Sequence, residues 1–115
     1  MSRIRISRFL ISLGIDPDHD GYEPLIYIII LVASCRGKTI PRMKDLYQEA
    51  ADSFGTSRSR TEHNIRAIVH SYWAQKDSHR IFSNVMHYPA GHDLCTKEFV
   101  SVLAEYVSIH RLYTL

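Results

Sequence analysis

The sequence predicts an all-α fold that contains a helix-turn-helix. Apolar residues recur at helical spacing in several segments of the chain. A glycine at Gly55 separates two of these segments, as the turn of a helix-turn-helix requires. The most apolar run, residues 25–33, has the length and the isoleucines of a buried strand, but no partner strand is visible elsewhere. We therefore expect this run to form a central buried helix.

The size and charge of the chain suit a single helical domain over residues 1–115. Its mass is 13.3 kDa, which is enough for one hydrophobic core. The formal net charge of +2 permits nucleic-acid binding without demanding it. Cys35 and Cys95 belong to no C-x-x-C pair, so we expect a reduced cytoplasmic protein and not a disulfide scaffold.

Residues 2–13 are predicted to form an amphipathic helix that ends near Gly14. The apolar part is too short and too interrupted for a signal peptide. Arg3 and Arg5 are candidates for phosphate contact or for a solvated helix end. The residues expected to face the core are Ile6, Phe9, Leu10 and Leu13.

The next stretch, residues 16–21, begins like the calcium-binding loop of an EF-hand. It reads D-P-D-H-D-G, but the twelfth position, which needs a bidentate glutamate, is Tyr27. We therefore expect a turn that leads into the central helix. Arg36-Gly37-Lys38 is expected to end that helix.

Thr39-Ile40-Pro41 is predicted to open the next helix, because proline is tolerated in a first turn. Arg42 and Lys44 are candidate phosphate contacts or ordinary solvated side chains. The inward stripe is expected to comprise Met43, Leu46, Tyr47, Ala50, Ala51 and Phe54. Small Ala50 and Ala51 would let the following helix approach closely.

The segment from about residue 57 to 74 is predicted to be the second helix of the motif. Either Thr56 or Ser57 can cap it, and capping-box spacing between Ser59 and Glu62 leaves its start open. The expected inner stripe is Thr61, Ile65, Ile68, Val69 and Tyr72. The expected outer side is Ser59, His63, Ala67 and His70, flanked by Arg60, Glu62 and Arg66.

This division into two faces is what a DNA-recognition helix needs. One face docks on the domain and the other enters the major groove. Arginine can pair bidentately with guanine, and glutamate can accept a hydrogen bond from the cytosine amino group. Protonation of outward-facing His63 would strengthen DNA binding at lower pH. The alternative for this segment is an ordinary amphipathic helix with solvated arginines.

After Trp73, we expect a polar turn over residues 74–79, a short helix around 81–86 and a loop over 88–94. Thr96 is predicted to cap the last helix, with Glu98 in its first turn. The expected inward stripe is Phe99, Val100, Leu103 and Val107, with His110 a further candidate. Tyr106 and Tyr113 are expected to be partly exposed, either packed on this domain or available for dimerisation.

The chain resembles the C-terminal DNA-binding domain of the sporulation master regulator, the response regulator that starts spore formation in Bacillus and Clostridium relatives. The most specific match is S-R-x-E-x-x-I-R, residues 59–66, followed seven residues later by Trp73. Further matches are Leu13-Gly14-Ile15, Gly21-Tyr22, Leu25, Lys44, Leu46-Tyr47, Ala51, Phe54, Thr56, Thr96, Glu98-Phe99 and Val100. The resemblance covers residues 6–112.

This resemblance implies a compact bundle of about six helices, whose third and fourth form a helix-turn-helix over about residues 42–74. It implies DNA contacts from Arg60, Glu62 and Arg66. The complete set of candidate DNA-binding residues is Thr56, Arg58, Ser59, Arg60, Glu62, His63 and Arg66. His63 stands where the family usually has an arginine.

The resemblance also implies partners. These are double-stranded DNA carrying tandem TGTCGAA-type boxes, a weak homodimer on those boxes, and RNA polymerase through its sigma subunit. No receiver domain precedes the helical domain in this chain. We therefore expect either an excised piece of a longer regulator or a free-standing relative.

No catalytic motif is recognisable in the sequence. None of the seven histidines forms H-E-x-x-H or lies beside a cysteine pair at zinc spacing, although His87 and His92 could meet Asp93. We therefore expect no enzyme activity, no metal site and no cofactor. The main alternative function is a helical protein–protein interaction module, which would tolerate the loss of Arg60 and Arg66. The segment nearest to a phosphotransfer motif, residues 63–66, lacks the required lysine.

Overall fold

Six α-helices make up the protein over residues 2–35 and 38–110, which the computed structural model describes. These residues contain no β-strand, which confirms the predicted all-α class. The helices are α1 (Ser2–Leu13), α2 (Tyr22–Ala33), α3 (Met43–Phe54), α4 (Arg58–Ala74), α5 (Ser78–Met86) and α6 (Thr96–Ile109).

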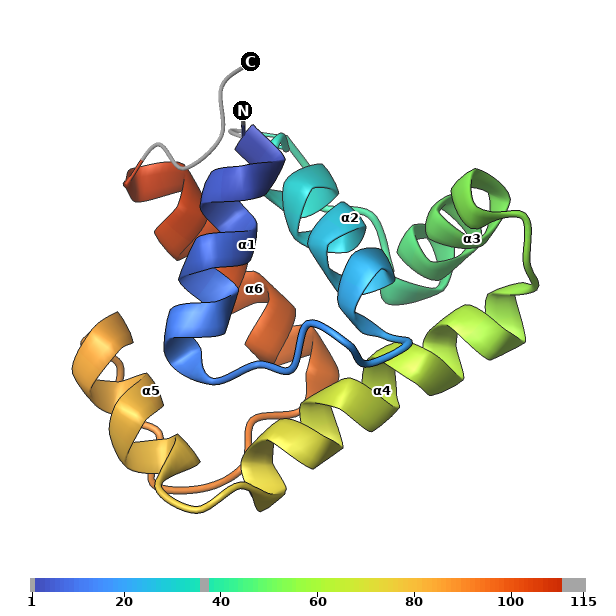
Figure 1. Ribbon diagram of the computed structural model, residues 1–115. Helices are drawn as coiled ribbons and strands as arrows, with labels where there is room; N and C mark the ends of the chain where they lie inside the picture. Colours follow the sequence, from blue (N-terminus) through green and yellow to red (C-terminus); the bar gives the residue numbers. More distant parts are fainter. Residues whose placement is uncertain (1, 36–37, 111–115) are drawn as a thin grey trace.

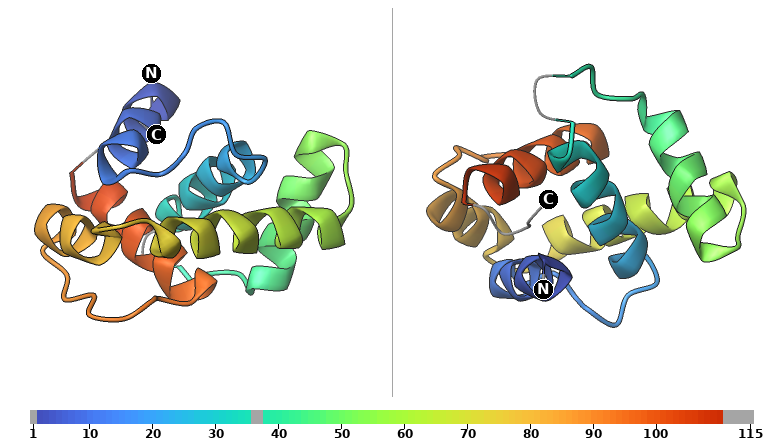
Figure 2. Two further views of the ribbon diagram at one scale, coloured as in Figure 1. Left: turned by 60° about the horizontal axis from the view of Figure 1, so that its bottom comes forward. Right: turned by 90° about the horizontal axis from the view of Figure 1, so that it is seen from above.

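Helix α2 lies at the centre of the bundle, as predicted for the most apolar run. It packs mainly against α6 and α3, while α1 lies on another side (Figure 1). The side chains of Leu25, Ile28 and Ile29 are completely buried. Helix α4 is the longest and crosses one side of the molecule, where it contacts α2, α3, α5 and α6 (Figure 2).

Helix α1 has the predicted amphipathic form. Its four core-facing residues are all buried. On its exposed side Arg3 forms an ion pair with Glu23 at the start of α2. The phenol of Tyr22 is hydrogen-bonded to the hydroxyl of Ser7 at 2.7 Å, and these two contacts join α1 to α2.

The structure corrects the predicted start and inner stripe of α3. The helix begins at Met43, after an extended Arg42 with ψ 152°, so Thr39-Ile40-Pro41 precedes it. A residue before proline avoids helical dihedrals, which favours an extended approach to the helix. Phe54 is 46% exposed instead of buried, and its ring meets the edge of Tyr27 at 5.8 Å.

The C-terminal part differs from the prediction mainly at helix ends. Helix α5 begins earlier than expected, at Ser78, and α6 begins at Thr96 with Cys95 in the cap position. Thr96 is therefore not the cap.

The end of α6 packs on α1 through aromatic rings. His110 is exposed and stacks on Tyr106 at 4.0 Å, and Tyr106 stacks on Phe9 at 4.4 Å. Half-buried Tyr106 thus packs on its own domain.

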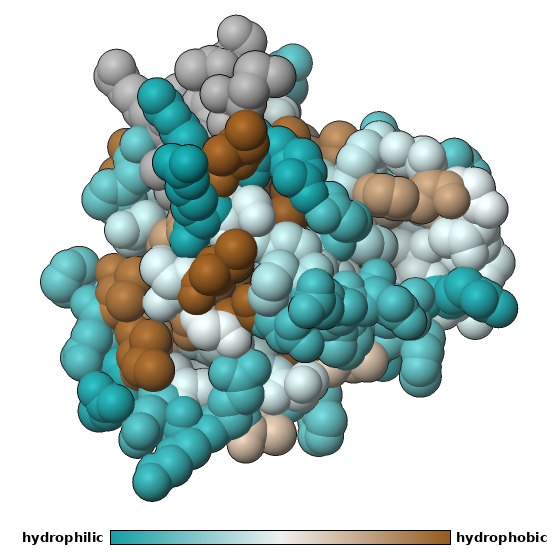
Figure 3. All heavy atoms as spheres, in the orientation of Figure 1, coloured by the Kyte–Doolittle hydropathy of each residue, from teal (hydrophilic) through white to brown (hydrophobic). Residues whose placement is uncertain are grey.

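Two sequence expectations fall outside the described residues: the Arg36-Gly37 part of the turn after α2, and the exposure of Tyr113. On the face seen in Figure 3, apolar side chains gather over α1 and α5, and the surface over α4 is more hydrophilic. None of the described helices is both long and apolar enough to cross a lipid bilayer.

Candidate nucleic-acid interface

A left-handed glycine makes the turn between α3 and α4. Gly55 has φ 66° and ψ 38°, a conformation that costs side-chain-bearing residues free energy. The following N–H, of Thr56, donates to the carbonyl of Ala51 at 3.0 Å, which satisfies a carbonyl at the end of α3. The predicted role of Gly55 is therefore confirmed.

Ser57 is the N-cap of α4, which settles the choice left open by the sequence. Its hydroxyl oxygen accepts a hydrogen bond from the backbone N–H of Arg60 at 3.1 Å. The hydroxyl of buried Thr61 donates to the Ser57 carbonyl, also at 3.1 Å. These bonds fix the first turn of the helix, in which Arg58, Ser59 and Arg60 all lie exposed.

The inner face of α4 is buried as predicted. Ile65 is completely buried, and Ala50 and Ala51 of α3 are completely buried too. Trp73 extends the buried face beyond the predicted stripe. The complete set of buried residues on α4 is Thr61, Ile65, Ile68, Val69, Tyr72 and Trp73.

The outer face of α4 carries the predicted polar side chains. Arg60, His63 and Arg66 are exposed, and Glu62 is half-buried. Within residues 2–35 and 38–110, the guanidinium of Arg60 has no hydrogen-bond or ion-pair partner. Arg60 is therefore free to meet a ligand.

Arg66, in contrast, is held in place. Its Nη2 lies 3.1 Å from Oε2 of Glu62, one helical turn earlier. Burial raises the pKa of the Tyr47 phenol, and a hydrogen bond with Arg66 partly opposes that rise. Glu62 thus pairs with the guanidinium at the edge of the outer face, close to Tyr47.

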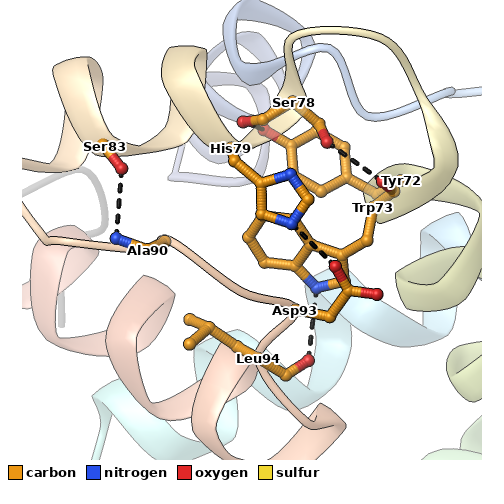
Figure 4. Close-up of polar contacts among 8 residues, drawn as sticks. All are labelled: Tyr72, Trp73, Ser78, His79, Ser83, Ala90, Asp93 and Leu94. Carbon is orange, nitrogen blue, oxygen red and sulfur yellow. Dashed lines mark hydrogen bonds and ion pairs between the residues drawn. The ribbon is translucent and has the colours of Figure 1, made fainter.

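The C-terminal end of α4 is fastened by contacts that the sequence did not predict (Figure 4). The indole N–H of Trp73 donates to the Leu94 carbonyl at 3.2 Å. The imidazole of His79 stacks on that indole at 4.8 Å, and its Nε2 lies 2.7 Å from Oδ1 of Asp93. The partner of Asp93 is therefore His79 and not His87 or His92. The cluster joins α4, α5 and the loop before α6.

Two further residues come close to the outer face from distant parts of the sequence. Lys97, in the first turn of α6, lines a hollow together with Arg66 and Tyr47. Asp20, in the loop before α2, lines a polar hollow of about 550 Å³ at the start of α4. The α4 residues around that second hollow are Ser57, Ser59, Arg60, His63 and Asn64.

The sequence did not predict the approach of Asp20 and Lys97, because neither belongs to the local pattern of the helix-turn-helix.

The predicted phosphate contacts before and within α3 lie at the surface. Lys44 is exposed, and Arg42 lies 3.7 Å from the carboxylate of Asp45. Among the described residues, no three His, Cys, Asp or Glu side chains come together in a way that could hold a metal ion.

Comparison with known proteins assigns the chain to a family. No curated protein matches it. The family model described as "Sporulation initiation factor Spo0A C terminal" matches residues 6–107, which is most of the chain and includes all six helices except the ends of α1 and α6. This is a family of regulator DNA-binding domains and not of enzymes. The chain therefore belongs to the Spo0A C-terminal family, the DNA-binding effector domains of sporulation regulators.

Proposed function

We propose that the protein is a sequence-specific transcription regulator that inserts α4 into the major groove of DNA. The observation that carries this proposal is the two-sided character of α4. One face is buried, and the opposite face presents Arg60, His63 and Arg66 to solvent. A helix that is capped at one end and fastened at the other presents its side chains in a defined geometry, as base reading requires.

Within this proposal the two arginines have different roles. Arg60 has no internal partner among the described residues, so it reads guanine or clamps a phosphate. Arg66 already pairs with Glu62, which restricts its side chain and lowers the entropic cost of forming a bidentate contact. Glu62 acts by orienting Arg66 or by accepting a hydrogen bond from cytosine.

The remaining candidate residues surround the start of α4. Thr56, Arg58 and Ser59 are all exposed there and would contact the DNA. His63 is exposed on the outer face of α4, where it would contact the DNA. Arg42, Lys44 and Lys97 would supply further phosphate contacts.

We further propose that residues 1–115 act as one domain, in which the motif over about 42–74 binds DNA. Pairing of two copies on tandem boxes and contact with the RNA polymerase sigma subunit are proposed from family membership. They are separate from base reading by α4, and each requires its own test.

The test is fluorescence-anisotropy binding to a tandem TGTCGAA-type duplex and to a scrambled duplex of equal composition. Both are measured at two salt concentrations, since purely electrostatic binding falls steeply with salt. We expect preference for the box, and we expect Arg60→Ala to weaken box binding by about 1–3 kcal/mol. Arg8→Ala removes one exposed arginine from α1 and is the matched control.

Each alternative outcome has a defined meaning. Equal binding of the wild type to both duplexes would contradict sequence specificity. Equal effects of Arg60→Ala and Arg8→Ala would show that only net charge matters. Absence of binding to either duplex would favour the protein–protein interaction module.

A further inference from the structure

The acidic loop over residues 16–21 has no role in the proposed base reading, yet its last aspartate reaches the α4 surface. Asp20 lines the polar hollow at the start of α4, together with residues that include Arg60 and His63. Within the part of the chain that the structure describes, the Asp20 carboxylate has no hydrogen-bond or ion-pair partner. An acidic residue without an internal partner and two basic residues therefore line the same open hollow.

The backbone around Asp20 is fixed against α4. Gly21 lies so close that an added Cβ would come within 2.2 Å of the Asn64 carbonyl oxygen. The N–H of Gly21 donates to Nδ1 of His19 at 2.9 Å. Tyr22, the next residue, is 2% exposed, and its hydroxyl contacts Ser7. These contacts hold the backbone of the residue after Asp20, so Asp20 is attached to a loop that is fixed beside α4.

We propose that Asp20 is a specificity-determining residue of the DNA interface: it keeps backbone phosphate out of this hollow, and of the two roles open to Arg60 it thereby favours base reading over phosphate contact. The inference rests on the proposed function. The carboxylate repels a phosphate that approaches Arg60 and His63, whereas an amino group of cytosine or adenine can donate a hydrogen bond to it.

This repulsion produces sequence specificity because the group that faces the hollow depends on the binding register, which is the position of the protein along the DNA. Registers that bring phosphate there are penalised, and a register that brings a base edge there is not. Specificity is a difference between affinities, so weakening the wrong complexes improves discrimination as effectively as strengthening the right one.

The test compares Asp20→Asn with Asp18→Asn, using the box and scrambled duplexes. Both substitutions remove one negative charge from the same loop, but Asp18 does not line the hollow. We expect Asp20→Asn to bind the scramble roughly threefold to tenfold tighter, with a smaller change for the box. The box-to-scramble ratio should fall for Asp20→Asn alone, and the difference should shrink at high salt.

Three results would overturn the inference. Equal gains from Asp20→Asn and Asp18→Asn would mean that net charge alone acts. Weaker box binding by Asp20→Asn would mean that Asp20 supports the specific complex. Unchanged binding to both duplexes would mean that phosphate does not enter the hollow. Thermal unfolding of both variants checks that neither substitution disturbs the fold.

Failure of the proposed function gives a different result. It appears as a wild-type protein that does not prefer the box, whatever the variants do. In that case, elution from immobilised heparin, a polyanion without bases, tests whether Asp20 excludes anions from the hollow. Later elution of Asp20→Asn than of Asp18→Asn supports exclusion at the hollow, and identical elution contradicts it.

Discussion

At the scale of single residues, Tyr72 joins α4 to the rest of the core. It is 1% exposed, and its hydroxyl donates to the Leu13 carbonyl at 2.9 Å. Burial raises the pKa of its phenol to about 12. The phenol of an unfolded chain ionises near pH 10, so the unfolded state loses this proton first as the pH rises. Stability that Tyr72 contributes below about pH 10 is therefore lost between about pH 10 and pH 12.

This shift gives the first prediction. Tyr72→Phe should lower the free energy of unfolding near neutral pH by about 1 kcal/mol, because a buried hydrogen bond is lost. It should also lose less stability than the wild type between pH 8 and about pH 11, because one ionising group is gone. Urea unfolding at both pH values measures this. Tyr27→Phe, at a half-buried tyrosine, is the control. Parallel losses in the wild type and Tyr72→Phe would contradict the assignment.

At the scale of helices, the position of α4 depends on close contact with the loop before α2. Gly21 has an ordinary negative φ of −83°, so conformational freedom does not explain why glycine is needed. A Cβ there would lie 2.2 Å from the Asn64 carbonyl oxygen and 2.9 Å from Cγ2 of Ile68. The backbones of α2 and α4 would have to separate to make room for it.

We therefore predict that Gly21→Ala both destabilises the protein and weakens box binding. Overpacking of this kind costs typically about 1–3 kcal/mol, and displacement of α4 misaligns Arg60 and Arg66. Thermal unfolding and anisotropy measure the two effects. Gly91→Ala is the control, because a Cβ at Gly91 would meet nothing within 4 Å. If Gly21→Ala behaves like Gly91→Ala in both assays, the contact does not position α4.

The interiors of the helices were predictable from sequence, whereas several of their ends were not. The stripes of α1 and α4 follow from apolar spacing, because burial of one face dictates that spacing. The start of α3 was placed too early because proline at Pro41 is compatible with a first turn and with an extended approach. Thr96 has the chemistry of a cap, yet Cys95 occupies the cap position.

The candidate interface was predictable only where it is local. The outer face of α4 follows from residues three and four apart on one helix. The approach of Asp20 and Lys97, and the pairing of His79 with Asp93, depend on how distant segments pack. Local periodicity contains no information about such contacts. The local pattern of the loop over 16–21 therefore indicates only an incomplete calcium-binding motif, although its last aspartate lies at the start of α4.

At the scale of the whole molecule, an apolar hollow lies between α2 and α6. It has a volume of about 440 Å³, and its lining includes Ile40 and Ile109. These two side chains are 51% and 66% exposed, so the hollow presents apolar surface to solvent. A second copy bound on a neighbouring DNA box could bury them.

We therefore predict that Ile109→Asp lowers cooperativity on tandem boxes and leaves single-box affinity unchanged. A charge in an apolar contact disfavours pairing, while α4 is untouched. Gel-shift titrations with one box and with two boxes measure both quantities. Ile4→Asp, on the exposed side of α1 where Ile4 is 48% exposed, is the matched control. Cooperative binding that survives Ile109→Asp would place the contact between copies elsewhere. Wild-type binding to two boxes as independent sites would exclude DNA-assisted pairing.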